Sequence, residues 1–323
     1  MVEVEVEVGS EPPDRAVHAA PQASLGSSGN LSWEEAVRAT LRTGLGDAGL
    51  TAQFLPTHRS AHRLARLRSS HGDDLFVKAF APWQQDAFTL EVAIYRQLHR
   101  TGIAPRLVHV DEAARLLVTE AAPCTRLSDL GAPLIRRHLA HVPAIYTALV
   151  GLRSLRPSRN HARRLVKHHA MIASSPEAEG LPAPSVVIQI VEGMAEMPVH
   201  GDFQPANLLA DAATLRVVDF ESYGPDVPAV DVARIAYNPL LPLDAYERSD
   251  LAAEMLYGLS CQWGVATSSR EFAAACVYWA VTCAGYFRKV VAAHGREGAL
   301  PAEAPVLATR PLALAADLWN RVG

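Results

Sequence analysis

A short segment between residues 200 and 221 carries the side chains best suited to chemistry. Asp202 and Asn207 are five residues apart, and Asp219 follows seventeen residues after Asp202. Mg²⁺ prefers oxygen ligands and is usually held by one or two protein groups together with nucleotide phosphates and water. We therefore predict that Asn207 and Asp219 bind Mg²⁺. The carboxylate of Asp202 is expected to orient an acceptor hydroxyl and take its proton during phosphoryl transfer.

The surrounding sequence predicts a tight loop followed by two short strands. Pro205 restricts the backbone of the loop, so that the first two side chains can point into one cleft. Residues 208–209 and 215–218 are short apolar runs typical of buried strands, and residues 211–214 are predicted to form the turn between them. Asp219 is thereby predicted to lie at the end of a strand.

The segment from His200 to Asn207 (HGDFQPAN), together with Asp219, resembles the Brenner motif and metal-binding aspartate of the aminoglycoside phosphotransferase and choline kinase family. Gly201 and Gln204 stand where protein kinases carry Arg and Lys, which favours the small-molecule branch. The resemblance implies an α+β, bilobal, protein-kinase-like fold. Its N-lobe is expected to contain a small antiparallel sheet, and its C-lobe is expected to be mainly helical.

The resemblance covers roughly residues 52–236 and implies supporting roles for two further side chains. Residues 228–233 match the family's Asp-x-Ala element, which implies that Asp231 buttresses the catalytic loop. His200 is better explained as a hydrogen-bonded support for that loop than as a proton carrier. We therefore expect both residues to be structural.

Lys78 and Glu91, which precede this segment in the chain, have the order and spacing expected of a phosphate-binding pair. Residues 75–80 are typical of a strand, and Lys78 fits the position that pairs with the nucleotide α and β phosphates. Glu91 follows thirteen residues later, in a segment over residues 87–98 whose spacings of four, three and four define one helix face. This face points toward the strands, so we predict an ion pair between Glu91 and Lys78.

The remaining nucleotide contacts follow from the resemblance. Residues 116–121 correspond to the strand leading into the interlobe hinge, which implies that the Thr119 carbonyl and the Ala121 amide hold the purine edge. Such backbone contacts leave the donor open between ATP and GTP. The hairpin expected to cover the phosphates has no glycine over residues 57–62, so the Ser60 hydroxyl and backbone amides are predicted to replace the usual close glycine approach.

Composition and apolar patterning indicate three segments. Residues 1–32 are predicted to be a disordered tail because a Gly-, Ser-, Pro- and Ala-rich run follows its Val-Glu alternation. Residues 33–121 are predicted as the nucleotide-binding N-lobe, and residues 122–323 as the C-lobe with the catalytic loop and acceptor site. The longest apolar stretch, residues 272–287, is too short for a confident membrane span and predicts a buried helix.

The acidic start of the chain does not resemble a secretory signal, and the four cysteines lack metal-ligand spacing. Both features predict a cytoplasmic protein with reduced thiols. The sequence leaves its oligomeric state open.

Charge is divided unevenly along the chain, whose net charge is −4. Residues 33–179 carry 20 Lys and Arg against 13 Asp and Glu, whereas residues 180–323 carry 9 against 16. An acidic larger lobe would attract a polycationic acceptor such as an aminoglycoside. The basic middle stretch lacks the interleaved aromatic residues of a single-strand nucleic-acid platform, so we expect no nucleic acid as a partner. We expect no membrane partner either, because the longest apolar stretch is too short for a confident span.

These features together predict a small-molecule kinase. It is expected to transfer the γ-phosphoryl group of ATP, or of GTP, to a hydroxyl of an antibiotic such as an aminoglycoside or another natural product. The alternative is a metabolic kinase of an amino alcohol, sugar or nucleoside. A catalytically silent nucleotide-binding regulator is a third hypothesis, motivated by the glycine-free hairpin and opposed by the complete set of Asp202, Asn207 and Asp219.

Overall fold

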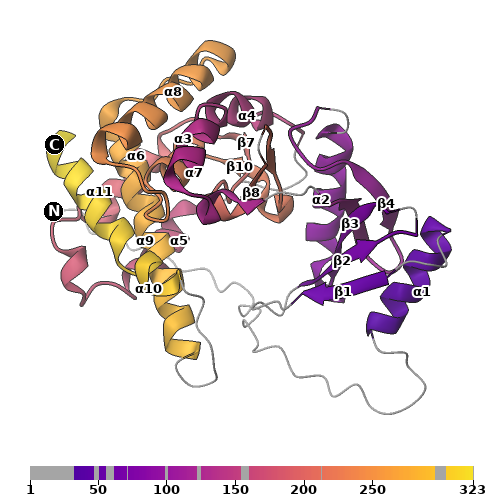
Figure 1. Ribbon diagram of the computed structural model, residues 1–323. Coiled ribbons are helices and arrows are strands. Elements are labelled where there is room, and N and C mark those ends of the chain that lie inside the picture. The colour runs from indigo at the N-terminus through magenta and orange to yellow at the C-terminus, as the bar shows by residue number, and fades with distance from the viewer. Residues whose placement is uncertain are drawn as a thin grey trace.

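The computed structural model describes residues 33–46, 51–55, 62–70, 72–98, 101–121, 125–153, 160–211, 213–294 and 303–322. These residues form a smaller part built on an antiparallel sheet and a larger part built mainly of helices (Figure 1). The predicted α+β class is therefore confirmed. The predicted tail, residues 1–32, lies outside the described residues.

The smaller part contains a five-stranded sheet in the order β1-β2-β3-β5-β4, with every neighbouring pair antiparallel. Its strands are β1 (Thr51–Leu55), β2 (His62–Arg68), β3 (Asp74–Phe80), β4 (Leu107–Asp111) and β5 (Leu116–Glu120). Two helices accompany the sheet, α1 (Trp33–Leu45) and α2 (Gln85–Leu98). Strand β3 is central, so the predicted strand over residues 75–80 is confirmed.

The two faces of this sheet meet different helices. Leu41 of α1 and Val77 belong to one apolar cluster. Phe88 of α2 packs against Phe80, with ring centroids 5.5 Å apart, in the other cluster. Successive side chains of a strand point to opposite faces, so Lys78 lies on the same face as Phe80 and α2.

The larger part carries two small sheets. Strands β6 (Thr125–Arg126), β8 (Leu208–Ala210) and β9 (Leu215–Val217) form one, and β7 (Met197–Val199) pairs with β10 (Gly224–Asp226) in the other. Along the chain, the change from the five-stranded sheet to these sheets falls between Glu120 and Thr125, where we predict the lobe boundary. The predicted catalytic loop joins β7 to β8, and β8 and β9 confirm the two predicted short strands.

Helices make up most of the larger part. They are α3 (Ala132–Leu139), α4 (Val142–Leu149), α5 (His161–His169), α6 (Pro184–Glu192), α7 (Pro228–Ala236), α8 (Ala245–Trp263), α9 (Ser269–His294), α10 (Ala304–Leu307) and α11 (Arg310–Val322). Helix α9 is the centre of this assembly, since α5, α6, α7, α10 and α11 all pack on it. Its residues 273–281 are buried, which confirms the buried helix predicted over residues 272–287. Among the helices described, none has both the length and the apolar character needed to cross a bilayer.

His138 of α3 is a buried polar residue that is expected to lower the stability of the fold. Its side chain is almost fully buried, and neither ring nitrogen has a hydrogen-bond partner among the described residues. A buried polar group without a partner costs about 1–3 kcal/mol. We expect His138→Leu to raise the free energy of unfolding by about 1 kcal/mol, measured by urea denaturation. The exposed neighbour His141 is the matched control, and His141→Leu should change stability little. Destabilisation by His138→Leu alone would show that the ring makes a stabilising polar contact.

Candidate active site

The loop after β7 brings together Asp202, the predicted catalytic residue, and Asn207, a predicted metal ligand. The Asn207 Nδ2 donates to the Asp202 Oδ2 at 2.9 Å and to the Asp202 carbonyl oxygen at 3.0 Å. The Gln204 Nε2 donates to the same Asp202 oxygen at 2.9 Å. Residues Pro205–Asn207 form a short 3-10 helix, as Pro205 favours, which turns Asn207 back toward Asp202. The Asp202 carboxylate is therefore held in one orientation while its side chain remains partly exposed.

His200, predicted as a structural support, is hydrogen-bonded both to this loop and to the segment after β9. Its Nε2 donates to the Val218 carbonyl at 3.1 Å, and its Nδ1 accepts the Asp202 backbone N–H at 3.2 Å. The ring is buried between the rings of Phe203 and Phe220, with centroid distances of 5.8 and 5.1 Å. Burial lowers the pKa of His200, which favours the neutral ring. These contacts suit a structural residue.

Asp231 makes the contact predicted for a loop buttress. Its Oδ2 accepts the Gly201 backbone N–H at 2.8 Å, and it forms an ion pair with Arg234 one helical turn later. Gly201 has a φ of +76°, a left-handed conformation that glycine adopts without steric cost. Burial raises the pKa of Asp231, and the Arg234 guanidinium acts in the opposite direction. The buried ion pair therefore fixes the backbone at the start of the loop.

Arg234 is a site residue that the sequence reasoning missed. It is buried on α7, and its Nε lies 3.9 Å from the Asp202 Oδ1. One guanidinium thus connects the loop buttress Asp231 with the catalytic candidate Asp202. The spacing of three residues between Asp231 and Arg234 on a predicted helix was a usable signal for the ion pair. The approach to Asp202 has no such local signal.

Lys78 lies among acidic side chains from both parts of the molecule. Its Nζ is 2.8 Å from the Glu91 Oε2 and 2.5 Å from the Asp219 Oδ1, and it is 3.7 Å from the Glu221 Oε2. The predicted Lys78–Glu91 ion pair is therefore confirmed. Burial by itself would lower the pKa of Lys78, but Glu91 and Asp219 raise it above its ordinary value. Burial raises the pKa of Glu91 to about 7, while Lys78 opposes this shift.

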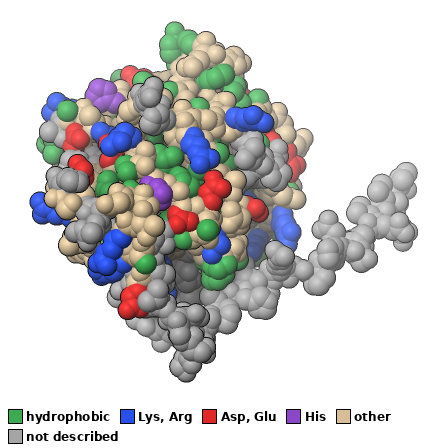
Figure 2. Space-filling view, turned by 90° about the vertical axis from the view of Figure 1, so that its right-hand side faces the viewer, with side chains coloured by type: hydrophobic (Ala, Val, Ile, Leu, Met, Phe, Trp, Pro, Cys, Tyr) green, Lys and Arg blue, Asp and Glu red, His purple; other side chains and the backbone are tan. Residues whose placement is uncertain are grey.

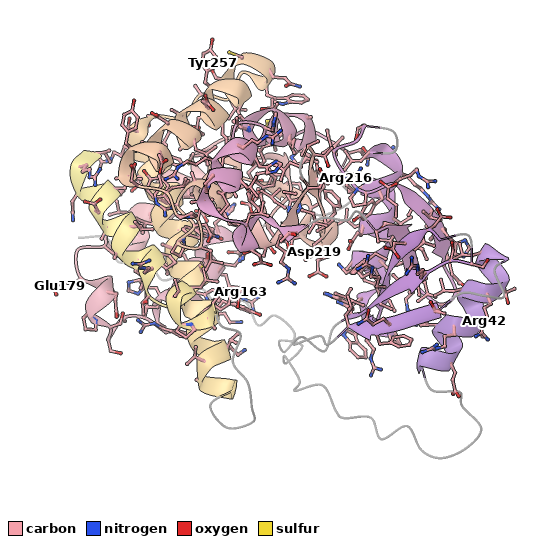
Figure 3. The ribbon with its side chains drawn as sticks, viewed as in Figure 1. Arg42, Arg163, Glu179, Arg216, Asp219 and Tyr257 are labelled. Atoms are coloured by element: carbon pink, nitrogen blue, oxygen red, sulfur yellow. The ribbon has the colours of Figure 1, made fainter. Side chains whose placement is uncertain are left out.

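Asp219 lies between the sheet part and the helical part (Figure 3). It lies two residues after the end of β9 and has a φ of +69°, a conformation that Asp tolerates better than most side chains. The Val218 backbone N–H donates to the Asn207 carbonyl at 3.0 Å, which brings the segment before Asp219 alongside the catalytic loop. Burial would raise the pKa of Asp219, but Lys78 lowers it below its ordinary value.

The donor set at this point fits Mg²⁺. The Asn207 amide nitrogen is used by Asp202, so its amide oxygen is left to act as a ligand, and Asp219 supplies a carboxylate. Within the described part of the chain, no cluster of three or more His, Cys, Asp or Glu side chains is arranged to hold a metal. Mg²⁺ needs only one or two protein oxygens when nucleotide phosphates complete its coordination. The assignment of Asn207 and Asp219 as metal ligands remains a prediction.

The sequence of residues 51–257 matches the model of the phosphotransferase enzyme family. This match spans well over half of the chain. The chain belongs to this phosphotransferase family.

Solved structures of low sequence identity share the fold. The choline/ethanolamine kinase family protein from Mesorhizobium loti is 16% identical with a TM-score of 0.63, covering 90% of this chain and all of that one. The choline kinase LicA from Streptococcus pneumoniae is 14% identical with a TM-score of 0.61, covering 88% of this chain and 99% of that one. Amicoumacin kinase hAmiN is 12% identical with a TM-score of 0.54, covering 89% of this chain and 94% of that one. No curated protein matches the sequence.

The two backbone groups predicted to contact the purine, those of Thr119 and Ala121, lie within β5 and directly after it. Thr119 is buried in β5 opposite Phe76 of β3. The Ala121 N–H donates to the Asp74 carbonyl at 2.9 Å, so it extends the pairing of β5 with β3. A purine contact by Ala121 therefore requires this hydrogen bond to be exchanged, and both backbone contacts stay predictions. Ser60, predicted to touch the phosphates, lies outside the described residues.

Several acidic side chains of the larger part have structural partners. Asp244 and Glu247 form a capping box at the start of α8, and Glu247 also pairs with Arg136 at 2.5 Å. The Glu271 carboxylate accepts the Ser268 backbone N–H at the start of α9. Asp226 is buried, and its Oδ1 lies 3.4 Å from the His161 Nε2. The negative charge of this half is therefore partly used in helix capping and ion pairs.

Basic and acidic side chains are interspersed on the face of the molecule shown in Figure 2. An ion pair also connects the smaller and larger parts of the molecule, since the Arg216 Nη1 of β9 lies 2.5 Å from the Glu120 Oε1 of β5. The Lys and Arg side chains visible on this face are thus not gathered into one continuous stripe.

Proposed function

We propose that this phosphotransferase is a small-molecule kinase that transfers the γ-phosphoryl group of ATP, or of GTP, to a hydroxyl group. The observation that carries the proposal is the junction of Lys78, Glu91 and Asp219, connected through the Val218–Asn207 hydrogen bond to a loop that presents Asp202. Within this junction, Lys78 and Asp219 are 141 positions apart in the chain, so only tertiary folding brings them into contact.

Each of these residues has a role in the proposed reaction. The Asp202 carboxylate orients the acceptor hydroxyl and takes its proton, and Asn207 fixes the carboxylate. Lys78, held by Glu91, binds the donor phosphates. Mg²⁺ bound by Asn207 and Asp219 would supply positive charge to the phosphates. Asp231 and Arg234 keep the loop in the geometry that an in-line transfer needs.

For the acceptor, we propose a natural-product antibiotic, including the aminoglycosides. The fold is shared with amicoumacin kinase hAmiN, solved in complex with AMP-PNP, Ca²⁺ and Ami. That complex also supports a nucleotide and a divalent cation as the partners of this fold. We further propose a cytoplasmic location, in agreement with the free thiols of Cys261, Cys276 and Cys283.

A metabolic kinase of an amino alcohol is a second candidate of equal standing. Two observations favour it. Choline and choline/ethanolamine kinases share the fold over nearly their whole length. The acidic side chains that would recruit a polycation are in part occupied by Arg136 and by helix ends. A catalytically silent regulator is disfavoured because Asp202, Asn207 and Asp219 are all present around one loop.

A panel of acceptors tests the proposal directly. Aminoglycosides, other hydroxylated antibiotics, choline, ethanolamine, sugars and nucleosides are each incubated with Mg²⁺ and ATP or GTP, and acceptor-stimulated release of ADP or GDP is measured. Turnover with one acceptor and the loss of that turnover in Asp202→Asn would support the kinase assignment. Tight nucleotide binding without turnover on any acceptor would favour the regulator instead.

The salt dependence of the acceptor KM should separate the acceptor classes. If the acceptor is a polycation attracted by the acidic larger part, raising salt to physiological strength should raise its KM severalfold while kcat changes little. The reason is that the Debye length falls to about 8 Å, which screens attraction between exposed charges. The measurement is KM against ionic strength at saturating Mg²⁺ and nucleotide. A flat profile for a good substrate would contradict a polycation mechanism and favour a neutral or singly charged acceptor.

A further inference from the structure

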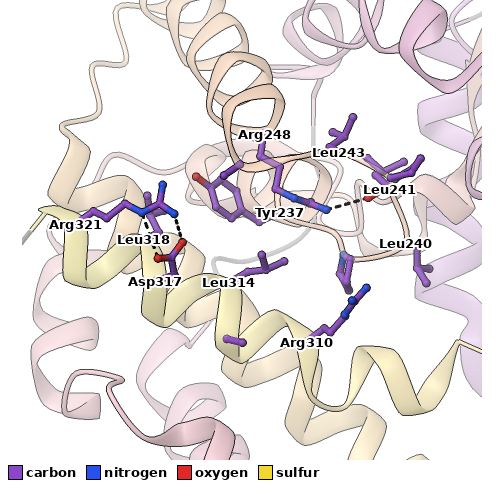
Figure 4. A pocket seen from close by; sticks show the side chains of 14 residues that line it. Tyr237, Leu240, Leu241, Leu243, Arg248, Arg310, Leu314, Asp317, Leu318 and Arg321 are labelled. Carbon is purple, nitrogen blue, oxygen red and sulfur yellow. Dashed lines mark hydrogen bonds and ion pairs between the residues drawn. The ribbon is translucent and has the colours of Figure 1, made fainter. Parts of the chain in front are cut away.

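A cavity of about 490 Å³ lies between α11 and the segment that runs from the end of α7 to the first turn of α8 (Figure 4). Its volume is within the range of about 300–1,000 Å³ that is usual for small-molecule sites. None of the residues assigned above to phosphoryl transfer lines it. The cavity therefore needs an explanation of its own.

Most of the wall is apolar. The loop after α7 and one face of α11 face each other across the cavity and contribute leucines from both sides, namely Leu240, Leu241, Leu243, Leu314 and Leu318. Tyr237, the residue that follows α7, adds an aromatic ring to the wall. These side chains would gain free energy by covering the apolar body of a ligand.

A buried arginine without a carboxylate partner lines the cavity. Arg248 of α8 is only 6% exposed. Its guanidinium donates to the carbonyl oxygens of Ala236, Asn238 and Leu241, each at 2.9 Å. These acceptors are neutral, and no carboxylate among the described residues lies within ion-pair distance of Arg248. Burial lowers the pKa of Arg248 because a buried charge lacks full solvation.

A second arginine adds to this positive charge. Arg310 stands at the start of α11, lines the same cavity and is exposed, with no ion pair to any carboxylate of the described chain. The third lining arginine, Arg321, is paired with Asp317, the carboxylate of the cavity wall. Arg248 and Arg310 are therefore left as two positive charges beside an apolar chamber. A bound anion would compensate them.

We propose that this cavity binds a small amphiphile with one anionic head group, either a carboxylate or a phosphate. The head group lies on Arg310 and Arg248, and the apolar body packs between the leucines of the loop and of α11. Binding needs neither nucleotide nor acceptor hydroxyl, so this site goes beyond the proposed kinase function. Because Tyr237 directly follows the helix that carries Asp231 and Arg234, an occupied cavity would brace the helix that holds the catalytic loop.

Isothermal titration calorimetry on the full chain without nucleotide tests the proposal. The probes are decanoate, decyl phosphate, decanol and decyltrimethylammonium, each below its micelle concentration. We expect saturable one-to-one binding of an anionic probe, with decanol and the cation bound at least tenfold more weakly. The preference between decanoate and decyl phosphate identifies the head group.

Two variants at exposed positions of α11 locate the binding. Arg310→Gln removes one charge and should weaken the anionic probe about tenfold, as expected for one charge-assisted hydrogen bond. Ala313→Trp places an indole in the cavity mouth and should abolish binding. Arg42→Gln, on α1 at the other end of the molecule, is the matched control and should bind like the parent chain (Figure 3). Equal affinity for the cationic probe, or unchanged binding in both α11 variants, would overturn the proposal.

Discussion

Asp202→Asn should lower kcat by roughly 10² to 10⁴ while leaving the nucleotide Kd nearly unchanged, because a positioned general base contributes about this much to a transfer reaction. The asparagine side chain has the shape of the carboxylate, so the contacts with Asn207 and Gln204 can be kept. It cannot take up the proton of the acceptor hydroxyl. The measurement is steady-state turnover on an identified acceptor, with nucleotide affinity determined separately by calorimetry.

Asp211→Asn is the matched control for this substitution. Asp211 closes the turn between β8 and β9 by accepting the backbone N–H groups of Ala213 and Thr214, at 2.8 and 2.7 Å. A hydrogen bond from the Thr214 hydroxyl, together with these two backbone N–H groups, holds the pKa of Asp211 down at about 2. Its replacement removes an equal charge close in sequence and should cost stability without a comparable loss of kcat. Wild-type turnover in Asp202→Asn would refute the role assigned to Asp202.

Asp219→Asn should remove the dependence of nucleotide affinity on Mg²⁺. In the parent chain we expect ATP to bind more tightly as Mg²⁺ is added. In the variant, the loss of a carboxylate ligand should weaken Mg²⁺-supported binding by about 100-fold or more, since even partners of metal ligands are worth about 10- to 100-fold. Lys78 also loses its partner at 2.5 Å, although Glu91 still holds it.

Glu221→Gln provides the comparison for the metal prediction. Glu221 lies in the same acidic group, 3.7 Å from the Lys78 Nζ, but it is not assigned as a metal ligand. Its replacement should leave the Mg²⁺ dependence of ATP binding largely intact. A reversed pattern, in which Glu221→Gln abolishes the dependence and Asp219→Asn retains it, would move the metal assignment to Glu221.

Features that depend on neighbours in the chain could be predicted from the sequence. The loop over residues 200–207, the two short strands after it and the helical face that carries Glu91 are governed by spacing, by Pro205 and by apolar periodicity. The expectation that Asp231 buttresses the catalytic loop followed from a family resemblance, which conveys tertiary information that the residues alone do not contain. The structure added the contact itself, with the Gly201 backbone N–H.

Contacts that depend on packing were not accessible in the same way. The approach of Arg234 to Asp202 and the direct contact of Lys78 with Asp219 join elements far apart in sequence. The hydrogen bond from the Ala121 N–H to the Asp74 carbonyl depends on how far along the chain β3 and β5 remain paired, and no local sequence pattern specifies this. Likewise, Asp244 and Glu247 contribute to the net negative charge counted for the second half of the chain, but the structure places both in a helix cap and Glu247 in an ion pair.

The sequence by itself determined which chemical groups this protein carries, and the types and spacing of Asp202, Asn207 and Asp219 already predict a phosphoryl-transfer loop. Only the tertiary structure decided which charges are neutralised. Lys78 meets three carboxylates, whereas buried Arg248 meets only neutral carbonyl oxygens beside a cavity. The physical reason is that the cost of a charge depends on its surroundings after folding, and those surroundings come from segments that the chain order does not place side by side.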